Sequence, residues 1–209
     1  MALDLSVYLV IGTRDVGRGE IGATVRAAVA GGVSAVQLRD KHASARELTA
    51  LAAQLCDVLA GTGVPLLVND RLDVALASGA DGVHLGQCDL DVGHARRLAG
   101  PGFLIGQSVS RPEEIAGVHA LPGGTVDYLG IGPVFPTLTK TDARPAIGLG
   151  TLTALRARTA LPCVGIGGID TRNAPSVWAT GVDGLAVISA ICGAPDPRSA
   201  AADLRGARP

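Results

Sequence analysis

The chain has 209 residues, of which 47% are hydrophobic and 2% aromatic, and its formal net charge is −1. This length fits one domain with a large aliphatic core, and so few aromatic side chains argue against a surface on which nucleic-acid bases stack. A charge close to zero gives no overall field toward nucleic acid or a membrane, so any binding of phosphate must depend on local cations.

The cysteines and the N-terminal segment predict a cytoplasmic protein. The four cysteines form no CxxC pair, which argues against a disulfide framework or a thiolate metal site. The opening MALDLSVYLV lacks the basic stretch of a secretory signal, and no apolar run approaches the roughly 18–20 residues of a membrane span. We therefore expect no membrane partner.

Eight short apolar segments recur along the chain, and most of them end in a polar or glycine-rich turn. They are continuously apolar instead of alternating, which is typical of parallel strands that helices cover on the outside. The expected strands are, in chain order, 7–11, 35–38, 66–68, 82–85, 104–106, 128–131, 164–166 and 185–188.

Helical patterns lie between these strands, and the second one begins with Ser-Ala-Arg-Glu, the sequence of a capping box. The alternation of strand and helix, without a break in composition, predicts a single domain over residues 1–209. Its expected fold is α/β, a parallel eight-stranded (β/α)₈ TIM barrel. An open doubly wound sheet is the alternative, which eight units in so short a chain disfavour. The expected helices are 20–30, 44–60, 72–77, 91–98, 112–120, 149–157, 171–179 and 198–204.

The segment 132–148, GPVFPTLTKTDARPAIG, interrupts this alternation because it has no apolar period. Loops of this length are uncommon in compact domains and are usually functional or disordered. A tolerated insertion is the other interpretation. The Thr-Leu-Thr-Lys core favours a functional loop.

Polar residues and glycines follow the expected strands, whereas the connections that precede the strands are mostly structural in character. In a parallel barrel the carboxyl ends of all strands meet at one rim, where active sites form. The sequence therefore predicts one site at that rim. Its candidate residues are Gln37, Arg39, Asp40, Lys41, Asn69, Asp70, His84, Gln87, Asp89, Ser108, Thr137, Thr139, Lys140, Gly167, Gly168 and Ser189.

The charged side chains at this rim predict phosphate and metal binding. Arg39, Lys41 and Lys140 are cations on two loops, and arginine offers a bidentate fork for phosphate whereas lysine acts as a point charge. Asp70 and Asp89 could share Mg²⁺, which takes one or two carboxylates together with water and substrate phosphates. Alternatively, each aspartate caps the helix that follows it.

The turns after the last two strands predict a cradle for a second phosphate. Gly167 and Gly168 would let backbone N–H groups approach the anion, and Ser189 follows the eighth strand. Such barrels frequently hold phosphate at these two loops. His84 is a candidate acid or base, with a structural histidine as the equal alternative.

Seven motifs combine the expected strands with the polar turns that follow them: VQLRDK (36–41), LLVNDRLDVAL (66–76), DGVHLGQCDL (81–90), IGQSVS (105–110), YLGIGPVFPTLTK (128–140), VGIGGI (164–169) and GLAVISAI (184–191). They resemble the motifs of the thiamine-phosphate synthase family, in the family's order and over nearly the whole chain. NDRxDxA, HLGQxDL and GPVFPTxTK are highly specific together. Cys88, Ser110-Arg111 and the opening YLVIGTRD depart from the family's usual pattern at positions that flank the expected ligands.

Enzymes of this family join a pyrimidinylmethyl diphosphate to a phosphorylated thiazole, giving thiamine phosphate and pyrophosphate. The resemblance implies Mg²⁺ held by Asp70 and Asp89. It implies catalytic roles for Arg39, Lys41, Lys140 and Ser108. The implied substrate-binding residues are Gln37, Leu38, Arg39, Asp40, Lys41, Asn69, Ser108, Thr137, Leu138, Thr139, Lys140, Gly167, Ile188 and Ser189.

The implied reaction is a dissociative displacement that needs no general base, so we expect catalysis by electrostatics and positioning. The thiazole could carry a carboxyl group. One alternative is a thiazole tautomerase of the same barrel family, and another is a sensor that binds phosphorylated ligands without turnover. The expected partners are the two small phosphorylated substrates, without nucleic acid, and a homo-oligomer is possible.

Overall fold

Eight parallel strands close into a ring in the computed structural model, which describes residues 3–17, 20–137 and 144–208. Each strand pairs with the next along the chain, and the last pairs with the first, so the sheet has no open edge. This confirms the predicted parallel TIM barrel and excludes the open doubly wound sheet. The strands are β1 (Val7–Ile11), β2 (Ala35–Leu38), β3 (Leu66–Asn69), β4 (Gly82–Leu85), β5 (Leu104–Val109), β6 (Tyr128–Ile131), β7 (Cys163–Ile166) and β8 (Gly184–Val187).

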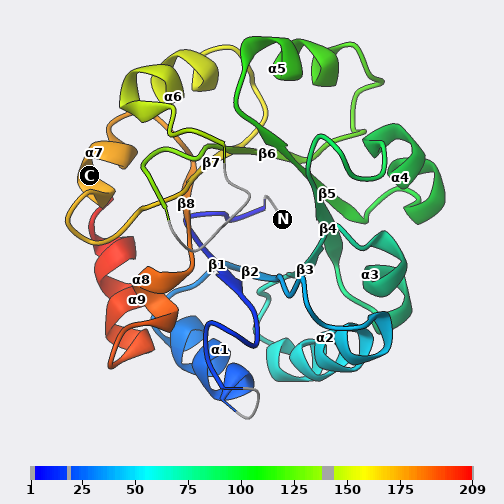
Figure 1. Ribbon diagram of the computed structural model, residues 1–209, viewed down its shortest axis with the longest axis vertical. Coiled ribbons are helices and arrows are strands. Elements are labelled where there is room, and N and C mark those ends of the chain that lie inside the picture. The colour runs from blue at the N-terminus through cyan, green and yellow to red at the C-terminus, as the bar shows by residue number, and fades with distance from the viewer. Residues whose placement is uncertain (1–2, 18–19, 138–143, 209) are drawn as a thin grey trace.

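Helices surround this ring of strands (Figure 1). They are α1 (Ile21–Ala30), α2 (Ala45–Leu59), α3 (Leu72–Ser78), α4 (Val92–Ala99), α5 (Pro112–His119), α6 (Gly148–Arg156), α7 (Ala174–Trp178), α8 (Ser189–Cys192) and α9 (Pro197–Gly206). The predicted capping box is present, since Ser44 and Glu47 each accept the other's backbone N–H at the start of α2. None of the helices in the described ranges is long and apolar enough to cross a membrane.

Two differences from the predicted elements lie at the carboxyl rim. β5 continues to Val109 because Gln107 and Ser108 still pair with β6, so Ser108 lies in the sheet and not in a turn. β8 ends at Val187, and the short helix α8 begins at Ser189. A helix of one turn has too few residues to show an apolar period in the sequence.

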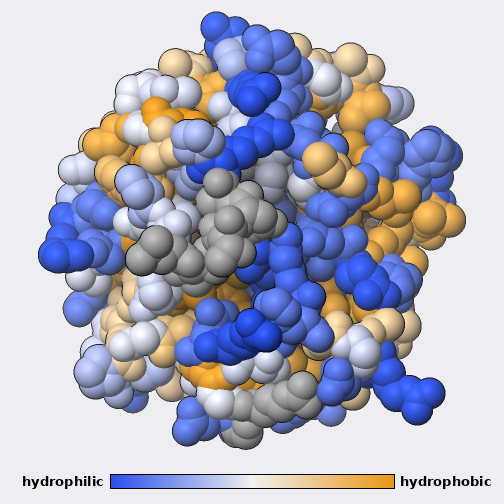
Figure 2. Space-filling view, viewed as in Figure 1, coloured by the Kyte–Doolittle hydropathy of each residue, from blue (hydrophilic) through white to orange (hydrophobic). Residues whose placement is uncertain are grey.

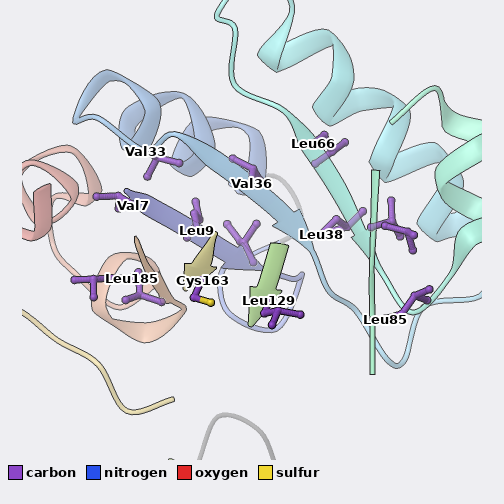
Figure 3. Close-up of a cluster of buried hydrophobic side chains, with 14 of the residues drawn as sticks. Val7, Leu9, Val33, Val36, Leu38, Leu66, Leu85, Leu129, Cys163 and Leu185 are labelled. Carbon is purple, nitrogen blue, oxygen red and sulfur yellow. The ribbon is translucent and has the colours of Figure 1, made fainter. Parts of the chain in front are cut away.

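The main core lies between the strands and the helices. Outward-facing aliphatic side chains such as Leu9, Val36 and Leu66 are fully buried there (Figure 3). A smaller cluster fills the inside of the barrel, where Leu5 and Tyr128 pack. The core is therefore aliphatic outside the ring, as the composition implies, whereas aromatic rings help to fill the inside.

The amino ends of the strands are joined by a contact that repeats four times around the ring. A polar residue just before each even-numbered strand exchanges two hydrogen bonds with a residue at the start of the preceding odd-numbered strand. Its side chain accepts the N–H of that residue, and its own N–H donates to the carbonyl of the same residue. The pairs are Ser34 with Val7, Asp81 with Leu66, Asp127 with Ile105, and Asp183 with Cys163.

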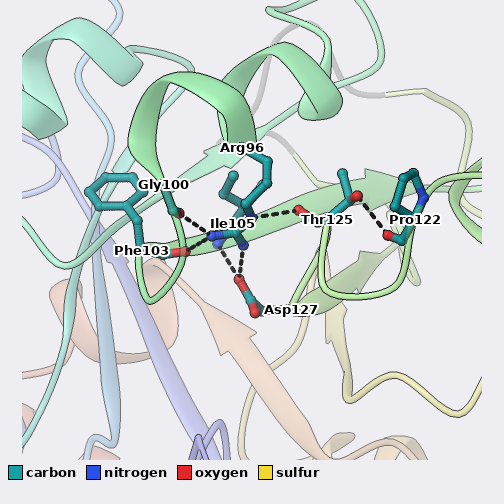
Figure 4. A network of polar contacts seen from close by, with 7 residues as sticks. All are labelled: Arg96, Gly100, Phe103, Ile105, Pro122, Thr125 and Asp127. Atoms are coloured by element: carbon teal, nitrogen blue, oxygen red, sulfur yellow. Dashed lines mark hydrogen bonds and ion pairs between the residues drawn. The ribbon is translucent and has the colours of Figure 1, made fainter.

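Arg96 reinforces one of these contacts (Figure 4). Its guanidinium pairs with Asp127 at 2.7 Å and also donates to the carbonyls of Gly100 and Phe103 at 2.9 and 2.6 Å. Asp127 accepts the Ile105 N–H at 2.7 Å at the same time. A part-buried arginine on α4 therefore ties the loop that precedes β5 to the residue that precedes β6.

We expect Asp127→Ala to lower the free energy of unfolding by about 2–3 kcal/mol, because it removes the acceptor of the Ile105 N–H and the charged partner of Arg96. Urea denaturation followed by circular dichroism measures the loss. Asp203→Ala, on the exposed face of α9, is the matched control and should change stability by less than about 0.5 kcal/mol. Equal stability of the two variants would contradict the role of Asp127.

Candidate active site

A cavity of about 310 Å³ lies at the carboxyl rim, and each of the eight strands contributes to its wall. Hydrophilic side chains gather around the centre of this face (Figure 2). The barrel thus brings together most of the residues that the sequence marks for the site. Those that line the cavity are Gln37, Arg39, Lys41, Asn69, Asp70, His84, Gln87, Asp89, Ser108, Thr137, Gly167, Gly168, Ile188 and Ser189.

Two predicted residues have their side chains elsewhere, and three cannot be placed. Leu38 is fully buried and packs in the core between strands and helices. The Asp40 carboxylate accepts the hydroxyl of Thr13 and the N–H of His42, so it braces the loop that carries the neighbouring cations. Leu138, Thr139 and Lys140 lie outside the described residues.

Cations reach the cavity from two loops. Arg39 and Lys41 line it from the loop after β2, as the sequence predicts. Sequence reasoning missed Arg144, whose Nη1 donates to the Ser110 hydroxyl and to Glu114 Oε1, both at 2.6 Å. Ser110 and Glu114 follow β5 at the carboxyl rim, so their position in the sequence could have marked them as residues of the site. Arg144 lies within the long loop 132–148 but beyond the GPVFPTxTK motif, so only its place in that loop could have marked it.

Asp70 and Asp89 form a pair of carboxylates at the wall of the cavity. Burial and the neighbouring Asp89 carboxyl raise the pKa of Asp70 to about 6, although Lys41 and Arg39 oppose this shift. Asp89 is held by the Gly86 N–H, which donates to Oδ2 at 2.7 Å. Two carboxylates that repel one another at neutral pH form a place where a bound cation is favourable.

The alternative interpretation of these aspartates as helix caps is wrong. α3 follows Arg71, which makes no side-chain cap, and α4 is capped by Asp91, which accepts the His94 N–H at 3.0 Å. Among the described residues no three His, Cys, Asp or Glu side chains gather as ligands, so protein would fill only part of a coordination shell. The pair fits Mg²⁺, which keeps water and substrate phosphate oxygens as its other ligands.

A glycine turn after β7 lies against the start of the long loop after β6. Gly167 has φ 103°, and a Cβ there would lie 2.6 Å from the Cβ of Pro133. The Phe135 N–H donates to the Gly167 carbonyl at 3.0 Å, which fastens the loop to this turn. Glycine is therefore required by the close approach of two segments, and the turn borders the cavity beside Ser189.

Five side chains form a continuous hydrogen-bonded chain across the inside of the barrel. Gln37 Nε2 donates to the Tyr8 hydroxyl at 2.9 Å, and the hydroxyls of Tyr8 and Tyr128 lie 2.8 Å apart. Tyr128 bonds to His84 Nδ1 at 2.9 Å, and His84 Nε2 bonds to Ser108 Oγ at 2.8 Å. Sequence reasoning missed both tyrosines and this contact of His84 with Ser108. The chain has only two tyrosines, and both lie in expected strands, so their position could have indicated a polar contact inside the barrel.

We expect Asp70→Asn to stabilise the metal-free protein in a pH-dependent way. Because the pKa of Asp70 in the folded state, about 6, lies above its ordinary 3.8, the cost in stability grows as the pH rises from 3.8 to about 6 and is complete above that value. The amide removes that cost, so the free energy of unfolding should rise by about 1 kcal/mol at pH 8, allowing for solvent screening. Near pH 4 the gain should vanish.

Asparagine tolerates the left-handed backbone at this position, φ 63°, as aspartate does, so strain should not obscure the result. Urea denaturation at pH 8 and pH 4 with a chelator present makes the comparison. An equal gain at both pH values would show that charge repulsion is not its cause.

Comparison with known proteins agrees with this geometry. The profile of the family described as thiamine monophosphate synthase matches residues 7–191. A thiamine-phosphate synthase from Albidiferax ferrireducens is 50% identical over 96% of this chain and 90% of its own length. One from Methanoculleus marisnigri is 47% identical over 94% of this chain and 92% of its own length.

Solved structures show the same likeness. The structure of a thiamine phosphate pyrophosphorylase from Pyrococcus furiosus is 40% identical, with a TM-score of 0.87 over 98% of this chain and 96% of that one. A 3-hexulose-6-phosphate synthase, 20% identical with a TM-score of 0.70 over 98% of this chain and 100% of that one, shares the fold alone. By its sequence and its barrel, the chain belongs to the thiamine monophosphate synthase family.

Proposed function

We propose that the protein is a thiamine-phosphate synthase that joins 4-amino-2-methyl-5-(diphosphooxymethyl)pyrimidine to 4-methyl-5-(2-phosphoethyl)thiazole. One observation carries the proposal: a single cavity is lined by a carboxylate pair, by cations and by a glycine turn. These are the groups required by a diphosphate with its metal ion and by a separate phosphate. The family membership and the names of the relatives support the same activity.

The pyrimidine diphosphate would occupy the side of the cavity formed by β2 to β5. Arg39 and Lys41, with Lys140 from the long loop, would neutralise its phosphate oxygens. Asn69 and Ser108 line the same cavity and would bind the pyrimidine ring, together with Gln37.

The phosphorylated thiazole would lie beside β7 and β8. Backbone N–H groups at Gly167, Ile188 and Ser189 would hold its phosphate, and Thr137 with Thr139 would contact it from the long loop. The proposal includes the carboxylated form of the thiazole, because the cations that line the same cavity would bind a carboxylate as well.

The reaction breaks the bond between the pyrimidine methylene carbon and the diphosphate oxygen, and forms a bond from that carbon to the thiazole nitrogen. Pyrophosphate leaves with the electron pair, so negative charge grows where Arg39 and Lys41 lie. Mg²⁺ held by Asp70 and Asp89 would supply further stabilisation of that charge. The electron-rich aminopyrimidine supports a cationic methylene, so a dissociative displacement needs positioning and electrostatics and no general base.

The proposal extends to the setting in which the enzyme works. It would act in the cytoplasm on these two small molecules, without nucleic acid or membrane as a partner. The net charge of −1 supports small phosphorylated substrates over nucleic acid, because the protein as a whole does not attract a polyanion and its cations at the site act only locally.

The first experiment mixes the purified protein with both substrates and Mg²⁺ and assays thiamine phosphate and pyrophosphate. Metal-dependent formation of both products in equal amounts supports the proposal. Binding of the thiazole phosphate without any product would overturn it in favour of a tautomerase or a sensor.

We expect Asp89→Asn to lower kcat/KM by about 100-fold, equivalent to about 2.7 kcal/mol of transition-state stabilisation, because it removes a negative ligand from the metal site. The matched control is Asp91→Asn, two positions along the chain. Asp91 is exposed and caps α4, and asparagine caps as well as aspartate. Steady-state kinetics across a Mg²⁺ titration would detect the difference, and equal activity of the two variants would refute the metal role.

A further inference from the structure

The hydrogen-bonded chain from Gln37 to Ser108 starts and ends at the cavity but passes through the barrel interior. Both end residues line the cavity, whereas Tyr128 in the middle is fully buried and is not part of the wall. Space for its ring depends on Gly106, where a Cβ would lie 2.1 Å from Tyr128 Cζ. The fold therefore encloses a polar connection between two substrate-binding side chains.

The positions of the hydrogens in this chain follow from its first bond. The Tyr8 oxygen accepts from Gln37, so the hydrogen of Tyr8 is left to donate to Tyr128. Tyr128 must then donate to His84 Nδ1, because an unused phenol hydrogen would be buried without an acceptor. Burial raises the pKa of Tyr8 to about 12 and that of Tyr128 well above its ordinary value, so both phenols keep their hydrogens at neutral pH.

The hydrogen bond from His84 to the cavity wall has the same donor-to-acceptor direction. Since Nδ1 of His84 accepts, the neutral ring carries its hydrogen on Nε2 and donates it to Ser108 Oγ. This is the reverse of a serine–histidine nucleophile pair, in which the ring accepts from serine. The Ser108 hydrogen is then free to point into the cavity and donate to a ligand, while His84 occupies one of the two Oγ lone pairs.

We infer that Tyr128 and His84 are positioning residues, which fix Ser108 as a hydrogen-bond donor to the bound pyrimidine diphosphate. This rests on the proposed function for the identity of the ligand. The orientation of the Gln37 amide sets the direction of the whole chain, because its nitrogen is committed to Tyr8. The two ends of the chain thus present one defined pattern of donors and acceptors to the same substrate.

The first test observes the His84 ring in the ligand-free protein and does not depend on the proposed function. Long-range ¹H–¹⁵N correlation spectra at neutral pH distinguish a bare ring nitrogen from a protonated one, and the signal is assigned by its loss in His84→Gln. We expect Nδ1 to be bare and Nε2 protonated in the wild type, and this preference to be lost in Tyr128→Phe. A wild-type ring with hydrogen on Nδ1, or on both nitrogens, overturns the inference.

The second test is a kinetic double-mutant cycle between Tyr128→Phe and Ser108→Ala. We expect Tyr128→Phe to raise KM for the pyrimidine diphosphate by about tenfold, the value of one net hydrogen bond, with little change in KM for the thiazole phosphate. In the Ser108→Ala background the same change should add almost nothing. Full additivity overturns the inference.

Two controls separate this outcome from other causes. Ser34→Ala removes a buried hydroxyl at the opposite end of the barrel, so it reports the effect of a general loss of stability and should leave both KM values unchanged. His84→Phe removes both ring nitrogens between Tyr128 and Ser108 and takes the place of Tyr128→Phe in the cycle if that variant fails to fold. If the wild type makes no thiamine phosphate, the proposed function fails, while the ring spectrum still decides the direction of the chain.

Discussion

Closure of eight parallel strands into a ring is the constraint on which the other features of this molecule depend. A closed parallel sheet places all amino ends at one rim and all carboxyl ends at the other. At the amino rim, four side chains bind the first residues of the neighbouring strands, among them Asp81, Asp127 and Asp183. These contacts satisfy strand N–H groups that would otherwise lack acceptors. At the carboxyl rim, by contrast, the loops carry polar side chains that line the cavity.

The inside of the ring has to be filled, and this chain fills much of it with polar side chains that satisfy each other. Tyr8, Tyr128 and His84 bring rings large enough to occupy the space, with glycines such as Gly106 opposite them. Each polar atom of the connection has a partner, so burial is not penalised as it would be for a lone hydroxyl. The same packing holds Gln37 and Ser108 in place, so the contacts that fill the barrel would also position the two side chains that we propose to bind substrate.

The electrostatics of the site contrast with the rest of the protein. Asp70 is held in a left-handed backbone conformation beside Asp89, and its pKa is raised to about 6. Such an arrangement costs stability when no cation is present and is typical of residues kept for binding. The neighbouring Arg39 and Lys41 reduce the repulsion only in part, so a metal ion and a diphosphate would complete the balance of charge between them.

The sequence by itself determined the barrel, the rim at which the site lies and most residues of its wall, because strand periods, turn glycines and the order of polar residues are local properties. It also determined the family, through motifs that extend from residue 36 to residue 191. Only the tertiary structure decided that Asp40 braces a loop, that Arg144 joins the site, and that Ser108 lies in a strand against His84. The hydrogen bond between the hydroxyls of Tyr8 and Tyr128 joins residues that are 120 positions apart in the sequence. No local pattern encodes such a contact, because it depends on the register of every strand between the two and on which side chains the closed ring turns inward.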